Sequence, residues 1–405
     1  MNRVLAALPL LAALGCATAT PPAAPAPAAR VGVEALADSA PAVLRGKRVG
    51  LITNHTGLTA DGRSTIDVLA GHPDVTLVAL FGPEHGIRGA AEAGEKVASG
   101  VDEKTGLPVH SLYGETHKPT PAMMQGIDAL VFDIQDVGAR PYTYVYTMAR
   151  GMQAAAEHGV PFVVLDRANP INGTVVEGGI LQPGFTSGVG LYAIPERHGM
   201  TAGELAQLFN GEFGIGADLT VVPVVGWQRA QWQDEAGLEW VNPSPNLRSL
   251  TAATHYPGSV FFEGTNLSEG RGTDAPFEQL GAPWLDAAAV VEAVNALALP
   301  GVRFEAIQLT VSEGGNKFPG QTIPGIRYVL TDRTVYRPVE ATVRLLEAIQ
   351  RRHPEEFKTT AFLDKLSGSG ELRAALAAGS VDALLTKWNA EAASFEQARA
   401  KHLLY

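Results

Sequence analysis

Cysteine is almost absent from this chain, and positive charge is scarce. The only cysteine among the 405 residues is Cys16, so the chain can form neither an internal disulfide nor a thiolate metal site. The 31 lysines and arginines are outnumbered by 42 aspartates and glutamates, which gives a formal net charge of −11. No stretch concentrates Lys and Arg into a stripe. We therefore expect neither a nucleic-acid partner nor a basic membrane-binding face.

The common signatures of nucleotide binding and nucleophilic catalysis are also missing. Residues 54–62, which follow the first predicted strand, contain no G-x-G-x-x-G pattern. Neither a G-x-x-x-x-G-K-[ST] phosphate loop nor a G-x-S-x-G nucleophile elbow occurs in the sequence. His55, His85 and Asp133 are of metal-ligating type, but no H-x-x-x-H pair supports a metal. We expect neither a cofactor nor a metal.

The N-terminus has the pattern of an export signal. Arg3 precedes an apolar run over residues 4–14 that is too short to span a bilayer, and Leu14-Gly15-Cys16 resembles a bacterial lipobox. We predict a lipoprotein signal over residues 1–16 with lipidation at Cys16, the alternative being an ordinary secretory signal. Residues 17–30 are rich in Ala and Pro and read as a tether. The mature protein is then exported and lipid-anchored in the cell envelope, in the periplasm or outer membrane if the cell is Gram-negative. No later segment has a transmembrane pattern.

The rest of the chain reads as two α/β domains. Hydrophobic residues make up 46% of the sequence and charged residues 18%, which is typical of a globular protein of this length with about two domains. Strand-like and helical segments alternate over residues 31–190, which predicts a Rossmann-like, doubly wound parallel sheet. The predicted strands are 48–54, 75–81, 127–134 and 160–165, and the predicted helices are 64–70, 120–126 and 142–158. Residues 191–405 are predicted to form a smaller C-terminal α/β domain that includes a strand at 219–225.

Polar side chains follow each of the four predicted strands of the first domain. The most distinctive of these strand ends is Gly-Pro-Glu-His-Gly over residues 82–86, which places Glu84 and His85 directly after an apolar run. Ligands of open α/β sheets bind at the carboxyl ends of the strands, and right-handed crossovers bring these ends to one edge. Any one of these residues alone could simply hold a turn. The full set is Asn54, His55, Glu84, His85, Asp133, Gln135, Asp136, Asp166, Asn169 and Asn172.

One loop of the second half carries a comparable density of polar residues. Residues 263–273 place three glycines among Glu263, Glu269 and Arg271. Glycines allow a backbone to approach a ligand closely while neighbouring side chains point at it. The alternative is a flexible surface loop, against which the apolar residues 260–262 and 276–277 anchor both ends.

Taken together, these motifs resemble the YbbC/NamZ-type exo-β-N-acetylmuramidase family. The resemblance extends from about Gly32 to Tyr405, although residues 316–320 look shortened against the family. It implies a glycoside hydrolase that removes N-acetylmuramic acid from the non-reducing end of peptidoglycan fragments, in an active cleft between the two domains. The motifs that carry it are residues 82–86, 132–140, 165–173, 197–199, 243–246 and 263–273.

Roles follow from this chemistry, because a glycosidase needs carboxyl groups on both sides of the scissile bond. We predict Glu84 as general acid/base, with His85 beside it, and Glu269 as nucleophile or stabiliser. Glu263 and Asp133 compete for the second role, and an acetamido group of the substrate is a further alternative. Arg271 or Arg140 would bind the lactyl carboxylate of muramic acid. Predicted sugar contacts further include Tyr142, Tyr144, Trp227, Asn54, Gln135, Asp166, Asn169, Asn246 and Asn266.

Two other functions stay open at this point. Another cell-wall hydrolase, such as an amidase, would need a metal site or a nucleophile elbow. A non-catalytic peptidoglycan-binding lipoprotein would keep the arginines and aromatics without needing Glu84. The sequence does not decide the oligomeric state.

Overall fold

The structure is a computed structural model that describes residues 28–88, 95 and 98–405. The predicted signal peptide with Cys16 and residues 17–27 of the predicted tether lie outside the described residues. Residues 28–30 were also assigned to the tether, and this part of the prediction is wrong. Ala29 is buried and donates its N–H to the carbonyl of Ala236 at 2.8 Å, while Arg30 forms a β-bridge with Val225.

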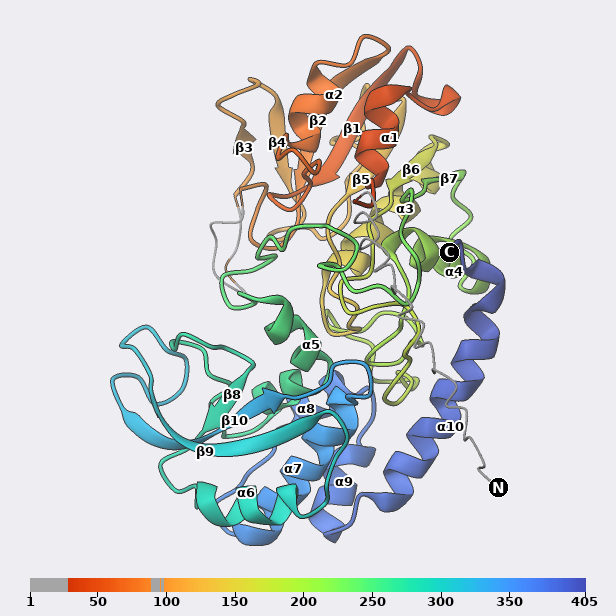
Figure 1. Ribbon diagram of the computed structural model, residues 1–405. Helices are drawn as coiled ribbons and strands as arrows, with labels where there is room; N and C mark the ends of the chain where they lie inside the picture. Colours follow the sequence, from red (N-terminus) through yellow and green to blue (C-terminus); the bar gives the residue numbers. More distant parts are fainter. Residues whose placement is uncertain (1–27, 89–94, 96–97) are drawn as a thin grey trace, which may run out of the picture.

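Within the described residues, seven strands form one large sheet in the order β3-β4-β2-β1-β5-β6-β7 (Figure 1). Neighbouring strands pair in parallel, except that β3 runs antiparallel to β4. This confirms the Rossmann-like, doubly wound sheet. The strands are β1 (Lys47–Thr53), β2 (Val75–Gly82), β3 (Gly100–Val101), β4 (Pro108–Ser111), β5 (Ala129–Asp133), β6 (Phe162–Leu165) and β7 (Leu219–Val222).

Helices cover both faces of this sheet, because its central strands are apolar on both sides. On β1, Val49 and Leu51 pack into the core under α1 (Gly32–Asp38) and α2 (Thr65–Ala70), whereas Ile52 joins the core of the opposite face. That opposite face is covered by α3 (Tyr144–His158) and α4 (Ala202–Glu212). Residues 120–126, predicted as a helix, form turns instead.

The second domain combines a small antiparallel sheet with helices (Figure 1). The sheet order is β8-β10-β9, and α5 packs against α7 and α6 against α7. A 3₁₀ turn over residues 260–264 follows α5 and leads into the polar loop at 263–273. The elements are α5 (Leu250–Ser259), β8 (Gln279–Gly281), α6 (Ala287–Asn295), β9 (Val302–Thr310), β10 (Thr322–Leu330), α7 (Pro338–Arg352), α8 (Ala361–Ser367), α9 (Glu371–Ala378) and α10 (Asp382–Arg399).

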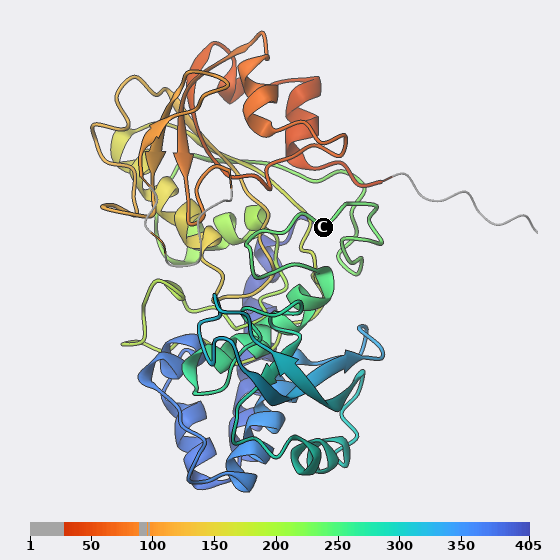
Figure 2. The same cartoon turned by 90° about the vertical axis from the view of Figure 1, so that its left-hand side faces the viewer.

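Two segments of the chain, β7 and α10, cross the border between the two domains. β7 lies beyond the boundary predicted at residue 190, yet it pairs with β6 and completes the first sheet. The structural border therefore falls after β7. At the other end of the chain, α10 runs along one side of the molecule from the second domain back to the first (Figures 1 and 2). The 3₁₀ turn that follows it (Ala400–His402) packs against α4.

Candidate active site

A cavity of about 600 Å³ lies between the two domains. The first domain contributes residues that follow β2 and β4 and one face of α3, and the second contributes the 263–273 loop and residues near Lys317. Of the predicted site residues, Glu84, His85, Tyr142, Glu263, Glu269 and Arg271 line this cavity. Carboxyl groups from both domains thus face one space.

Glu84 is held where the strand β2 gives way to a tight turn. β2 ends at Gly82, and Pro83 cannot continue its hydrogen-bond ladder. The next residue after Glu84, His85, is buried and has a φ of 68°, a left-handed conformation that non-glycine residues adopt rarely and that clusters at functional sites. Thr143, which immediately precedes α3, donates a hydrogen bond to Glu84 Oε2 at 2.9 Å. The carboxyl group is therefore fixed by two separate elements.

Tyrosines surround Glu84 on the cavity side. Tyr142 contacts Tyr144 and Tyr256 edge-on, with ring centroids 5.0 and 5.6 Å apart. Burial raises the pKa of Tyr142 and Tyr256 well above the ordinary value, and it is reinforced by the Tyr256 phenol for Tyr142 and by the Glu263 carboxylate for Tyr256. Burial and a hydrogen bond to Glu84 raise the pKa of Tyr113 to about 12. These phenols therefore stay protonated at neutral pH and can donate hydrogen bonds to a bound ligand.

The opposite wall holds two carboxylates and two cations. Arg271 Nη2 lies 2.5 Å from Glu263 Oε1, and its Nε lies 3.1 Å from Glu269 Oε1. Lys317 Nζ lies 2.9 Å from Glu269 Oε2 and also donates to the carbonyls of Phe262 and Leu267. Glu269 is thus clamped between two cations, whereas Glu263 has one. Burial raises the pKa of Glu263, and Arg271 partly opposes the shift.

Two glycines of the 263–273 loop have a left-handed backbone conformation, and one of them packs closely against a neighbouring loop. Gly270 and Gly272 have φ values of 81° and 82°, and a Cβ on Gly272 would lie 2.7 Å from Gly315. The loop ends against Phe277, whose ring carries the Arg271 guanidinium at 5.2 Å. This packing excludes the alternative of a flexible surface loop.

Other predicted site residues do not line the cavity, because their side chains bind neighbouring groups of the protein instead. Both carboxylate oxygens of Asp133 are bound by the buried Arg167, and one also accepts from Thr65. Arg140 forms a fully buried ion pair with Glu196. Asn54 accepts from Thr56, Gln135 donates to the carbonyls of Asp136 and Ala168, Asn169 donates to the carbonyl of Met200, and Asn266 donates to the carbonyl of Glu356. Asn246 is half-buried and lies outside the cavity lining, although Ser244 and Leu247 belong to it.

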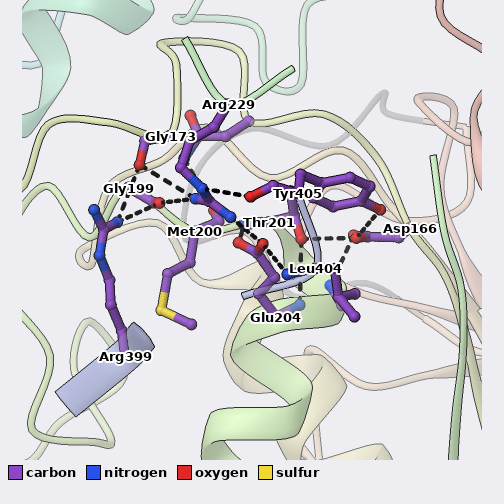
Figure 3. A network of polar contacts seen from close by, with 12 residues as sticks. Asp166, Gly173, Gly199, Met200, Thr201, Glu204, Arg229, Arg399, Leu404 and Tyr405 are labelled. Atoms are coloured by element: carbon purple, nitrogen blue, oxygen red, sulfur yellow. Dashed lines mark hydrogen bonds and ion pairs between the residues drawn. The ribbon is translucent and has the colours of Figure 1, made fainter. Parts of the chain in front are cut away.

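Asp166 is the clearest of these structural residues (Figure 3). Its carboxylate accepts hydrogen bonds from Thr201 and Gly203 at 2.7 Å and from the hydroxyl of Tyr405 at 2.8 Å. Burial raises its pKa to about 6, against the effect of these donors. Asp166 therefore anchors the last residues of the chain to the end of β6.

Two predicted aromatic contacts also belong to the core. Tyr144 is buried and donates its hydroxyl to the carbonyl of Pro243, and Trp227 packs on Tyr405 outside the cavity. In exchange, the cavity contains Tyr113, Thr143, Arg150, Tyr256 and Lys317, none of which the sequence analysis selected as site residues. They come from helices, from loops and from the end of β4, a strand that was not predicted, so only the tertiary fold reveals them.

Over residues 28–88, 95 and 98–405, no group of three or more His, Cys, Asp or Glu side chains is placed to hold a metal ion. None of the helices in the same residues is both long and apolar enough to cross a membrane.

A two-domain α/β scaffold that holds carboxyl groups on both walls of an interdomain cavity has the arrangement of a glycosidase site. Comparison with known families agrees. Residues 49–251 match the N-terminal domain and residues 254–405 the C-terminal domain of the exo-β-N-acetylmuramidase NamZ family. The chain belongs to this family, and one of its relatives, substantially identical to it in sequence, is a glycosidase.

Individual relatives cover nearly the whole chain. The peptidoglycan β-N-acetylmuramidase NamZ of Bacillus subtilis (strain 168) is 46% identical over 382 residues, which span 94% of this chain and 92% of that protein. Two crystal structures of DUF1343 family proteins from Bacteroides fragilis NCTC 9343 share the fold. Their TM-scores are 0.87 and 0.74, at 36% and 31% identity, and each match covers 93% of this chain and 99% of the other.

Proposed function

We propose that this protein is a glycoside hydrolase that releases N-acetylmuramic acid from the non-reducing end of peptidoglycan fragments, in cell-wall turnover and recycling. The observation that carries the proposal is the interdomain cavity, where Glu84 of one domain shares a space with Glu263 and Glu269 of the other. The relationship to the Bacillus subtilis peptidoglycan β-N-acetylmuramidase supports the choice of substrate.

In this proposal Glu84 protonates the oxygen of the leaving sugar. Thr143 orients its carboxyl group, and the neighbouring phenols of Tyr113 and Tyr142 supply protonated donors. A general acid of this kind contributes roughly a hundred- to ten-thousand-fold to the rate. On the opposite wall Glu263 or Glu269 attacks the anomeric carbon or stabilises the positive charge that develops there, and the substrate's own acetamido group is the alternative nucleophile. Water then adds to the anomeric carbon and completes the release of the sugar. The cation clamp around Glu269 favours a fixed, stabilising role for that carboxylate.

A chromogenic β-N-acetylmuramide tests the proposal. The purified protein should release the aglycone without added metal or cofactor. An amidase or a non-catalytic peptidoglycan-binding protein would leave this compound intact, so the absence of release under conditions where the protein is folded would overturn the proposal.

We also propose that the protein is exported and anchored by a lipid on Cys16, which lies in the lipobox-like Leu14-Gly15-Cys16. The motif and the Ala- and Pro-rich residues that follow it support this proposal. A Cys16→Ser variant should move from the membrane pellet to the soluble fraction. Identical fractionation of the variant and the wild type would contradict the anchor.

A further inference from the structure

The positively charged side chains in the cavity wall differ in whether they form ion pairs with carboxylates. Its lysine and arginine side chains, among the residues that the structure describes, are Arg150, Arg271 and Lys317. Arg271 and Lys317 are committed to the carboxylates of Glu263 and Glu269. Arg150 has neither an ion pair nor a side-chain hydrogen bond within residues 28–88, 95 and 98–405. The cavity thus contains one guanidinium that no described carboxylate neutralises.

Holding this group in the wall is unfavourable in the ligand-free protein. Arg150 is half-buried in the middle of α3, and burial lowers its pKa, an effect that nearby Tyr192 opposes only in part. A guanidinium nevertheless stays charged at neutral pH. A partly desolvated cation without a counterion attracts an anionic group of a ligand. The planar guanidinium can bind both oxygens of a carboxylate at once.

The position of Arg150 on α3 relates it to the proposed proton donor. Thr143, Thr147 and Arg150 follow one another at helical spacing and all line the cavity. Thr143 holds Glu84, and Arg150 lies seven residues further on, about 10 Å along the helix axis. One helix face therefore sets the distance between the site of bond cleavage and the cation. A substrate that fills this space should carry its negative charge away from the scissile bond.

We propose that Arg150 binds the lactyl carboxylate of N-acetylmuramic acid and so distinguishes this sugar from N-acetylglucosamine, which lacks the lactyl group. The inference rests on the function proposed above. It replaces Arg271 as the receptor for the carboxylate, because Arg271 already contacts Glu263 and Glu269. Arg271 is then a positioning residue for the acidic wall.

The test compares two substrates that differ only at the lactyl carboxyl group, which is charged in one and neutral in the other. One is an aryl β-N-acetylmuramide with a free lactyl carboxylate, and the other is its neutral lactyl methyl ester. For Arg150→Gln, kcat/KM on the free acid should fall about 10- to 100-fold, mainly through KM, because a charge-assisted contact is lost. Turnover of the ester should stay within about twofold of the wild type. Arg150→Lys, which keeps the charge but not the fork, should fall between the two.

Two further variants control the experiment. Arg303→Gln removes an exposed arginine of β9 and should leave kcat/KM unchanged on both substrates. Arg271→Gln should slow both substrates to a similar degree, because it disturbs the acidic wall irrespective of the lactyl charge. Binding of free N-acetylmuramic acid, measured by calorimetry, should weaken in Arg150→Gln and provides a readout independent of catalysis.

The possible failures are distinguishable. If the wild type releases no aglycone from the free acid, the proposed function itself is wrong. If the wild type is active and folded Arg150→Gln loses equally on acid and ester, or loses nothing, the assignment of Arg150 is overturned. A charge-selective loss in Arg271→Gln instead would return the role to Arg271. Should Arg150→Gln not fold, Arg150→Lys with the acid and ester pair decides the question.

Discussion

At the scale of single residues, similar carboxylate side chains acquire different roles from partners that are distant in sequence. Glu84 and Asp166 follow strands β2 and β6 of the large sheet, and Asp133 is the last residue of β5. Asp133 and Asp166 are completely buried and accept hydrogen bonds from Arg167 and Tyr405 respectively. Glu84, in contrast, lines the cavity. The strand-end pattern therefore identifies candidates, but it does not separate catalytic acids from structural ones. Arg167 is 34 residues from Asp133 and Tyr405 is 239 residues from Asp166, so the pairings arise only in the folded chain.

His255 provides a prediction at this scale. It is completely buried on α5 beside the hydroxyl of Tyr336, at 2.9 Å, and burial lowers its pKa to about 3. The unfolded chain binds a proton at this histidine below about pH 6.5, while the folded chain does not, so stability falls as the pH falls from 6.5 towards 3. The loss amounts to about 3 kcal/mol between pH 6.5 and pH 4.

Urea unfolding of the wild type and of His255→Gln from pH 4 to pH 7 measures this effect. The variant should be less stable near neutral pH, and its stability should fall less steeply towards acid. Parallel stability profiles for the two proteins would rule out a neutral, buried His255 as a source of the acid sensitivity.

At the scale of elements, most helices and strands could be predicted from periodicity and end signals. α3 ends at Gly159 and α4 begins with a capping box from Thr201 and Glu204, both visible in the sequence. α5 was not among the predicted elements, and it contains Pro257 and Gly258, two residue types that are unfavourable inside helices. Its helix is stabilised by the Ser249 cap and by close packing on α7, where a Cβ on Gly258 would lie 2.1 Å from the Pro338 carbonyl oxygen. Such packing has no local signature.

The 263–273 loop gives a prediction for an element. Gly272→Ala would force a side chain into a left-handed backbone conformation and against Gly315, at a cost of about 1–3 kcal/mol. Because the loop positions Glu269 and Arg271, we expect turnover of the muramide to fall at least tenfold. Gly46→Ala is a matched control with a similar φ of 70° and no atom within 4 Å of the added Cβ. Equal effects on activity from both variants would show that the loop conformation is unimportant.

At the scale of the whole molecule, the end of the chain ties the two domains together. α10 returns from the second domain, and Arg399 donates to the carbonyls of Gly173 and Gly199 in the first (Figure 3). The Tyr405 hydroxyl then bridges Asp166 and the N–H of Val224. The sequence showed that the second half is α/β, but it did not show this return or the place of β7 in the first sheet. Both depend on contacts between segments far apart in the chain.

Tyr405→Phe tests this connection. Removal of the hydroxyl leaves a buried carboxylate and a backbone N–H without one partner each, which should lower the free energy of unfolding by about 1–3 kcal/mol. Since the network lies outside the cavity, kcat/KM of the folded variant should be unchanged. A double variant with Asp166→Asn should lose less stability than the sum of the single variants, as expected for residues in direct contact. Strict additivity would contradict the coupling.

The role of Glu84 as general acid is tested most directly by the hydrolysis of the natural disaccharide MurNAc-GlcNAc by Glu84→Gln. The substitution keeps the shape of the side chain and the hydrogen bond from Thr143 but removes the acid. Release of N-acetylmuramic acid should fall roughly a hundred- to ten-thousand-fold. Turnover of an aryl muramide with a good leaving group should fall much less, because that aglycone needs little protonation. If the folded variant cleaves the natural disaccharide at close to the wild-type rate, Glu84 is not the general acid and the proposed site chemistry is wrong.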